Sequence, residues 1–301
     1  MSEGRDGFLL IDKERGWTSH DVVAKVCGVT GVKKAGHAGT LDPMATGLVV
    51  VGLGRATRLL RFVQDLPKEY MATLAFGVAT DTLDADGAIM SREPMPVTIE
   101  EVTAVLSRFT GRIMQIPPMV SALRVDGRRL YELAREGKVV DRPPRPVQVY
   151  ELDMVDFAPS DYPEATMRIV CGKGTYIRSL ADDIAQALGG RAHLTSLRRT
   201  RAGSLEVDSS GHQIADLERA AAQGRLDGLI MDPAAGLVDL PSVEADEGTA
   251  AAVLHGMQFS ASMFVVGTAD DQPYRVLDQS GRLLAVYRIS GPKAVAEVVL
   301  A

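Results

Sequence analysis

An uncharged run in the N-terminal part of the chain is the feature that most restricts its fold. Residues 46–54 read TGLVVVGLG, with β-branched side chains at three successive positions. A run that is apolar at both odd and even positions is typical of a strand buried at the centre of a sheet. A chain of 301 residues is long enough for two domains, or for one large domain with an appendage.

The segments around this run predict a mixture of strands and helices. Apolar patterns predict strands at residues 7–13, 69–80, 145–157 and 164–174. Helical spacing predicts helices at residues 19–29, 55–66, 98–109 and 175–190. The first helix has a cap at Thr18 or Ser19, the third has a capping box of Thr98 and Glu101, and Gly189 ends the last. This order predicts a mixed α/β or α+β domain over residues 1–240, without the regular βαβ repeat of a Rossmann chain.

Residues 124–145 interrupt this pattern. They contain a turn at Asp126-Gly127, a short amphipathic piece around Leu130 and Leu133, and a proline-rich end. A basic insertion of this kind favours a lid or thumb that closes on a partner, and the alternative is a solvated surface helix.

Residues 241–301 predict a separate, compact, β-rich unit. A helix ended by Gly256 is followed by short apolar stretches that predict strands at residues 263–269, 274–281, 283–289 and 294–300. The turn at Asp278–Gly281 predicts a hairpin between two of them. The size of this unit suits an accessory binding module.

The positive charge is concentrated in a few segments of an acidic chain, whose formal net charge is −6. Basic residues outnumber acidic ones over residues 33–61, 108–148 and 168–201, and the balance reverses after residue 202. Such a distribution allows a basic groove that attracts a polyanion, although basic clusters are often only solvated helix faces.

One carboxylate stands alone in GHAGTLDPMATG, residues 36–47, where Asp42 precedes Pro43. An Asp before Pro is most often a turn residue, and a catalytic role is the alternative. The nearest acidic cluster, DTLDADG at residues 81–87, partly matches a calcium loop, but Thr82 stands where Asp is expected. The flanks of this cluster do not predict two helices, so calcium binding is not favoured.

A second polar stretch offers Asp42 a partner. CGKGTYIRSLADD places Lys173, Tyr176 and Arg178 at a turn from strand to helix, where N–H groups and a guanidinium hold an anion or a carboxylate. If Arg178 faces Asp42, the pair keeps the acid ionised and oriented. A structural salt bridge between them is the other interpretation.

Five longer motifs carry a family resemblance. They are GHAGTLDPMATGLVVVGLGRATRLL, KEYMATLAFGVATDTLDADG, PPMVSALRVDGRRLYELAREG, CGKGTYIRSLADD and LRRTRAG. In this order they closely resemble the TruB family, the bacterial tRNA pseudouridine synthases that modify the uridine at position 55 in the T-arm. The resemblance covers residues 7–203, and the tail resembles a shortened PUA-type RNA-binding module. It implies an α+β catalytic domain with a central, mainly antiparallel sheet flanked by helices.

The resemblance also implies roles for individual residues. Asp42, in LDP, is implied to be the catalytic aspartate, Tyr70 to stack on the target base, and Arg178 to pair with the aspartate. Leu197 matches an apolar residue of the pocket, and His37 one that fills the space vacated by the extruded nucleotide. The further substrate or RNA contacts that we expect are Lys13, Lys173, Tyr176, Asp84 and Arg124. Lys13 matches the lysine of the first family motif, although Glu14 stands where proline commonly follows.

These resemblances imply an isomerase that needs no cofactor and no metal, with tRNA as partner. Isomerisation of uridine loses no group and oxidises nothing, which fits a chain without evident metal-ligand clusters. No apolar run reaches the roughly 18 residues of a membrane span, and we expect a cytoplasmic monomer with Cys27 and Cys171 as buried free thiols. The alternative is a tRNA-binding or tRNA-folding protein of the same fold without catalysis. The complete set of Asp42, Tyr70 and Arg178 argues against it.

Overall fold

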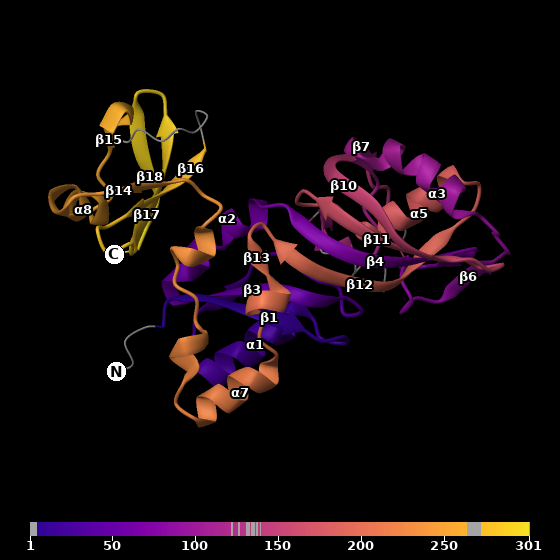
Figure 1. The fold of residues 1–301 in the computed structure, drawn as a ribbon, viewed down its shortest axis with the longest axis horizontal. Coiled ribbons are helices and arrows are strands. Elements are labelled where there is room, and N and C mark those ends of the chain that lie inside the picture. The colour runs from indigo at the N-terminus through magenta and orange to yellow at the C-terminus, as the bar shows by residue number, and fades with distance from the viewer. Residues whose placement is uncertain are drawn as a thin grey trace.

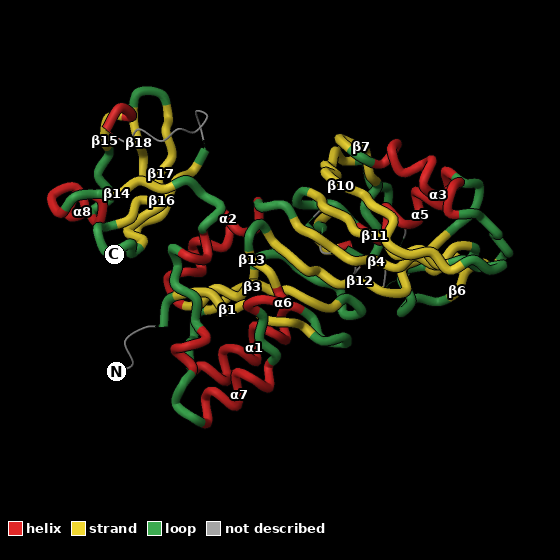
Figure 2. The backbone as a smooth tube through the Cα atoms, viewed as in Figure 1, coloured by secondary structure: helices red, strands yellow, loops and turns green. Residues whose placement is uncertain are grey.

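The computed structural model describes residues 5–300 apart from residues 122, 126, 131–132, 134–135, 137, 139 and 264–271. A long twisted sheet runs through the molecule, and a smaller sheet lies at one end (Figures 1 and 2). The long sheet has nine strands, whose central path is β1-β3-β12-β4-β11-β10-β7, with β2 on β3 and β13 on β12. Their bounds are β1 Gly7–Lys13, β2 Ala35–His37, β3 Thr46–Leu53, β4 Lys68–Phe76, β7 Gly111–Gln115, β10 Arg145–Ala158, β11 Glu164–Cys171, β12 Ala192–Ala202 and β13 Leu205–Glu206.

The pairing in this sheet is antiparallel except between β12 and β3. This confirms the mainly antiparallel α+β architecture. The parallel pair is short, with Arg198 opposite Thr46 and Arg199 opposite Gly47. Gly47 has a φ of +94°, and a Cβ atom there would lie 2.2 Å from the Arg199 carbonyl oxygen. Only glycine therefore allows the two backbones to approach at this point, which lies beside the candidate site.

The β3 strand is buried on both faces, as its apolar run predicts. Val49 and Val51 belong to one core cluster, and Leu48 and Val50 belong to another on the opposite face. Side chains of a strand alternate between faces, so a strand between two cores needs apolar residues at every position. The first core lies under four helices: α1 Ser19–Thr30, α3 Ile99–Leu106, α5 Ile177–Ala187 and α7 Ile214–Ala222. The second core lies under η1 Gly54–Leu59 and α2 Leu60–Asp65.

Capping confirms two predicted helices. Thr18 caps α1 in a capping box with Asp21, and Thr98 caps α3 in the expected box with Glu101. The predicted helix over residues 55–66 is different, because its first half forms the 3-10 helix η1. The predicted strand over residues 69–80 also breaks at Gly77, whose φ is +82° and whose N–H donates to the Arg191 carbonyl.

Smaller elements connect the main ones. After Gly77 the chain forms a hairpin of β5 Val78–Thr80 and β6 Ile89–Arg92. Within the predicted thumb, β8 Arg124–Val125 pairs with β9 Arg128–Arg129, and Leu130 and Leu133 are buried. Asp126 of the expected turn lies outside the described residues. The other short helices are η2 Ser107–Phe109, α6 Val207–Ser210, η3 Leu226–Leu229 and η4 Ala235–Leu237.

The smaller sheet has five strands in the order β14-β16-β17-β18-β15. It comprises β14 Ser242–Glu244, β15 Phe259–Ser260, β16 Pro273–Leu277, β17 Leu283–Ser290 and β18 Lys293–Val299, with α8 Glu247–Leu254 and η5 Ala261–Met263. The hairpin at Asp278–Gly281 is present, whereas the predicted strand over residues 263–269 falls almost entirely outside the described residues. Among the described helices, none is long and apolar enough to cross a membrane.

The smaller sheet contacts the large domain through η1, α2 and the second core. Leu283, Val286 and Val298 belong to the same buried cluster as Leu60 and Phe62. Polar contacts surround this apolar contact: Arg55 Nη1 donates to the Leu300 carbonyl at 2.8 Å, Arg58 Nη1 to the Val299 carbonyl at 2.7 Å, and Arg61 pairs with Glu297 at 2.6 Å. Three cations of the basic segment 33–61 therefore contact the C-terminal sheet.

Candidate active site

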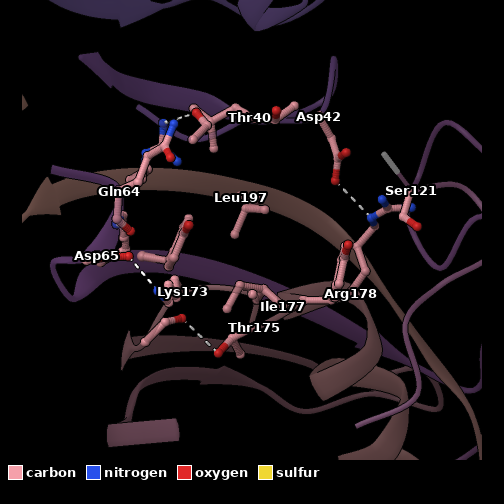
Figure 3. A pocket seen from close by; sticks show the side chains of 18 residues that line it. Thr40, Asp42, Gln64, Asp65, Ser121, Lys173, Thr175, Ile177, Arg178 and Leu197 are labelled. Atoms are coloured by element: carbon pink, nitrogen blue, oxygen red, sulfur yellow. Dashed lines mark hydrogen bonds and ion pairs between the residues drawn. The ribbon is translucent and has the colours of Figure 1, made fainter. Parts of the chain in front are cut away.

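A cavity of about 520 Å³ opens where the β2–β3 loop and strands β4 and β12 meet the N-terminus of α5 (Figure 3). This volume falls in the range of small-ligand sites in proteins. Two carboxylates line it, Asp42 and Asp65, and Figure 3 shows them in different parts of the cavity. The cavity is also lined by Lys68, Tyr70, Ser121, Lys173, Tyr176, Arg178, Leu197 and Arg199.

Asp42 is held by the loop that carries it. The Lys13 side chain is only 1% exposed, and its Nζ donates to the carbonyls of Glu14, Trp17 and Pro43 at 3.0, 2.7 and 3.3 Å. On the other side of Asp42, the Leu41 N–H donates to Ser19 Oγ at 2.8 Å. The aspartate thus lies between two fixed neighbours. Lys13 is buried among carbonyls and anchors the Asp42 loop through Pro43, and its role as an RNA contact stays a prediction.

Arg178 pairs with Asp42, as the interpretation of the two motifs required. The guanidinium Nε lies 2.9 Å from Asp42 Oδ2, and the Arg178 side chain is 3% exposed. Its other nitrogens donate to the carbonyls of Thr82 at 2.7 Å and Val120 at 2.8 Å, which fixes its plane. The arginine is therefore held by contacts on three sides.

Asp42 keeps 36% of its side chain exposed because it faces the cavity. Burial raises the pKa of the carboxyl above its ordinary value, the Arg178 guanidinium opposes that rise, and the Asp84 carboxylate adds to it. Burial is the largest of these effects, so the carboxylate is more basic than a solvated aspartate.

Asp84 lies behind this ion pair and is 5% exposed. Its Oδ2 is 3.5 Å from Arg178 Nη1, and its Oδ1 accepts from Thr82 Oγ1 at 2.6 Å and from the Asp86 N–H at 3.2 Å. The turn is tight enough to hold Leu83 at a φ of +63°. Asp84 therefore contacts Arg178 from inside the protein, and its role as a substrate contact stays a prediction. Among the described residues there is no group of three metal-ligating side chains.

Tyr70 on β4 and Leu197 on β12 both line the cavity. Leu197 is 6% exposed. Burial raises the pKa of the Tyr70 phenol, and the neighbouring Arg199 guanidinium opposes that rise. An aromatic face next to an apolar wall is suited to stacking on a planar base.

Arg199 is a cavity residue that sequence analysis missed. It is 2% exposed and stands opposite Tyr70 in the β12–β4 pairing. Its Nε donates to the Leu48 carbonyl at 2.7 Å and its Nη2 to the Gly39 carbonyl at 3.1 Å. The side chain therefore connects β12, which pairs with the strand of Tyr70, to β3 and to the loop that leads to Asp42. Alternation along β12 was the available signal, because residues 197 and 199 lie on the same face of a strand.

Two of the remaining predicted residues line the cavity. Lys173 and Tyr176 line the cavity, and Lys173 Nζ contacts Asp65 Oδ1 at 2.6 Å with both side chains largely exposed. His37 lies on β2 outside the cavity lining, and burial lowers the pKa of its imidazole. Arg124 lies on β8 at the start of the thumb segment.

Solved structures share this fold. A crystal structure of a Cbf5-Nop10-Gar1 complex contains a chain with 26% identity and a TM-score of 0.77, with coverage of 99% of this chain and 84% of that one. The mainly antiparallel sheet, with an Asp-Arg pair and a tyrosine in one cavity, agrees with the fold and site that the resemblance to pseudouridine synthases implies.

The sequence comparisons identify the particular family. Residues 28–177 match the model of the TruB family pseudouridylate synthase N-terminal domain, and residues 178–237 match the tRNA pseudouridylate synthase B C-terminal domain. The tRNA pseudouridine synthase B of Symbiobacterium thermophilum is 47% identical over 84% of this chain and 82% of that protein. That of Geobacillus kaustophilus is 43% identical over 83% of this chain and 90% of its own length. The chain belongs to the TruB family of pseudouridylate synthases and is an enzyme of that class.

Proposed function

We propose that this enzyme converts the uridine at position 55 of the tRNA T-arm to pseudouridine, with Asp42 as the catalytic carboxylate. The observation that carries the proposal is the Asp42-Arg178 ion pair, at 2.9 Å, in the same cavity as Tyr70. The names of the relatives support tRNA as the RNA substrate. The match of the long motifs around these residues supports the T-arm position.

The reaction needs a carboxylate near the sugar. The N1–C1′ bond of uridine breaks, the uracil turns, and a C5–C1′ bond forms, while C5 loses its proton and N1 gains one. Asp42 acts at the sugar, either as a nucleophile at C1′ or as a base that removes a sugar proton. Both routes require the ionised carboxylate, and the Arg178 guanidinium stabilises that form.

The target base must leave the stack before this chemistry takes place. Tyr70 offers the extruded uracil an aromatic face, and Leu197 offers it an apolar wall. His37 lies on the β2 strand outside the lining, and we assign it to the space that the nucleotide vacates. The cavity therefore divides into a stacking region and a polar end that contains Asp42 and Arg178.

The RNA outside the cavity binds by its phosphates. We assign this contact to Lys173 at the rim, to Arg124 and the rest of the thumb segment 124–145, and to the C-terminal sheet of residues 241–301 as an RNA-binding module. Phosphate contacts of this kind make affinity fall as salt increases. The enzyme acts as a monomer in the cytoplasm, where its tRNA substrate is found.

The experiment that tests the proposal uses two tRNA transcripts that carry tritium at C5 of uridine. One has uridine at position 55, and the other has cytidine there. Release of tritium from the first transcript alone is expected. Equal release from both would refute the T-arm position, and binding without any release would favour a non-catalytic tRNA-binding protein.

A further inference from the structure

We propose that Ser121 determines specificity for uracil by forming a hydrogen bond with the polar edge of the extruded base. This inference rests on the proposed function, because it places the uracil in the cavity of Asp42. Ser121 lines that cavity, and Figure 3 shows it next to Arg178 at the end that contains Asp42.

The Ser121 hydroxyl is buried and lacks a well-formed hydrogen bond within the protein. The residue is 6% exposed, and its Oγ makes no hydrogen bond of ordinary geometry with the residues that the structure describes, although it interacts with the Tyr176 phenol. A buried hydroxyl without a partner costs free energy, and native proteins keep few such groups. A hydroxyl that lines a substrate cavity finds its partner when the substrate binds.

The segment that carries Ser121 is anchored to the start of α5. Gln115 Nε2 donates to the Tyr176 carbonyl at 3.0 Å, and its Oε1 accepts from the Tyr176 N–H at 2.8 Å. Ser179 Oγ donates to the Ile116 carbonyl at 2.9 Å. Val120, next to Ser121, accepts from Arg178 at 2.8 Å. The guanidinium that holds Asp42 thus also holds the residue before Ser121, so the hydroxyl has a defined position relative to the catalytic carboxylate.

Two hydroxyls lie at this end of the cavity. The Tyr176 phenol also lines it, and burial raises the pKa of that phenol while the nearby Ser121 hydroxyl opposes the rise. Leu197 lines the apolar part of the same cavity. A planar base that stacks in the apolar part therefore directs its polar edge toward either the ion pair or these hydroxyls.

The hydrogen-bonding groups of Ser121 and of the uracil edge are complementary. A serine hydroxyl offers one donor and two acceptor sites, and uracil offers two carbonyl oxygens and one imide N–H. A site that hydrogen-bonds a substrate group discriminates strongly against an analogue that lacks the group, because the protein partner is then left unpaired. Ser121 thus reads the edge by which uracil differs from other bases.

The test measures kcat/KM for wild type and Ser121→Ala on a T-arm stem-loop, with chromatography of the digested nucleosides. The target position holds uridine or one of three analogues. 4-Thiouridine and 2-thiouridine each replace one carbonyl oxygen by weakly accepting sulfur, and 3-methyluridine lacks the imide N–H. Thr30→Val is the matched control, because it deletes another buried hydroxyl, at the end of α1 and outside the described cavity lining.

We expect Ser121→Ala to lower kcat/KM for uridine by about tenfold, as for loss of one hydrogen bond in a buried site. For the analogue that lacks the uracil group bonded by Ser121, the kcat/KM values of Ser121→Ala and wild type should agree within about twofold. Thr30→Val should match wild type on every substrate. Equal kcat/KM of Ser121→Ala and wild type on uridine, or a loss of the same size on all four substrates, would overturn the inference. Failure of wild type to convert uridine would instead refute the proposed function.

Discussion

The buried lysine under the Asp42 loop should make stability depend on pH in a defined way. Lys13 is 1% exposed, and burial lowers its pKa from 10.5 to about 8, against the opposing effect of the Asp42 carboxylate. A base with a lower pKa in the folded state binds fewer protons when folded than when unfolded. Between pH 8 and 10.5, the free energy of unfolding therefore rises with pH.

The size of the effect follows from the two pKa values. A difference between 10.5 and about 8 corresponds to about 3 kcal/mol, since one pKa unit is worth about 1.4 kcal/mol. Lys13→Met keeps an unbranched apolar side chain and removes the titrating group. The wild-type free energy of unfolding, relative to that of this variant, should thus increase by about 3 kcal/mol from neutral pH to above pH 10.5.

Urea unfolding at a series of pH values measures this difference. Lys33→Met, at an exposed position, supplies the baseline for alkaline effects that do not depend on the buried site. Burial also lowers the pKa of Lys68 to about 8, so the wild-type curve alone contains both lysines, whereas the difference isolates Lys13. A difference between wild type and Lys13→Met that stays flat or falls as pH increases would refute the reasoning.

Three other outcomes follow from the site. Asp84→Asn removes a charge that raises the pKa of Asp42, so the acid limb of the pH profile of the single-turnover rate should move to lower pH. An acid limb at the wild-type pH would contradict this expectation. Asp86→Asn is the control. Arg199→Met should slow single turnover by roughly 100-fold, as expected when reacting groups are misplaced, while filter binding shows tRNA affinity within about twofold. Weaker tRNA binding by Arg199→Met without slower single turnover would be evidence that Arg199 does not position the reacting groups. Lys173→Ala should reduce the slope of log affinity against log salt by about 1, and an unchanged slope would remove it from the RNA contact.

The sequence predicted an element correctly where its burial follows a regular pattern of apolar residues. The run at residues 46–54 implied burial on both faces, and the β3 strand has a core on each side. The break at Gly77 depends on a distant segment, because its N–H donates to the Arg191 carbonyl. A pattern within residues 69–80 contains no information about that partner.

In the candidate site, too, some features follow from local sequence and others depend on contacts with distant segments. Asp42 and Arg178 could be paired as a hypothesis, since both occur at polar turns next to glycines. The roles of basic residues could not be predicted from their number, because their partners come from other segments. Arg198 and Arg199 are neighbours, yet Arg198 pairs with Asp12 and Asp208, whereas Arg199 points inward to backbone carbonyls. The strand register decides which of the two is buried.

Asp42 is the residue on which the proposed cofactor-free isomerisation of the T-arm uridine depends. The most direct test is tritium release from a T-arm stem-loop with tritium at C5 of the target uridine, without added metal and with EDTA. Asp65→Asn is the matched control, because Asp65 is the other carboxylate in the described cavity lining. Release by wild type and Asp65→Asn, with none by an Asp42→Asn variant that still binds the RNA, is the expected result. Release by Asp42→Asn at the wild-type rate would contradict the account.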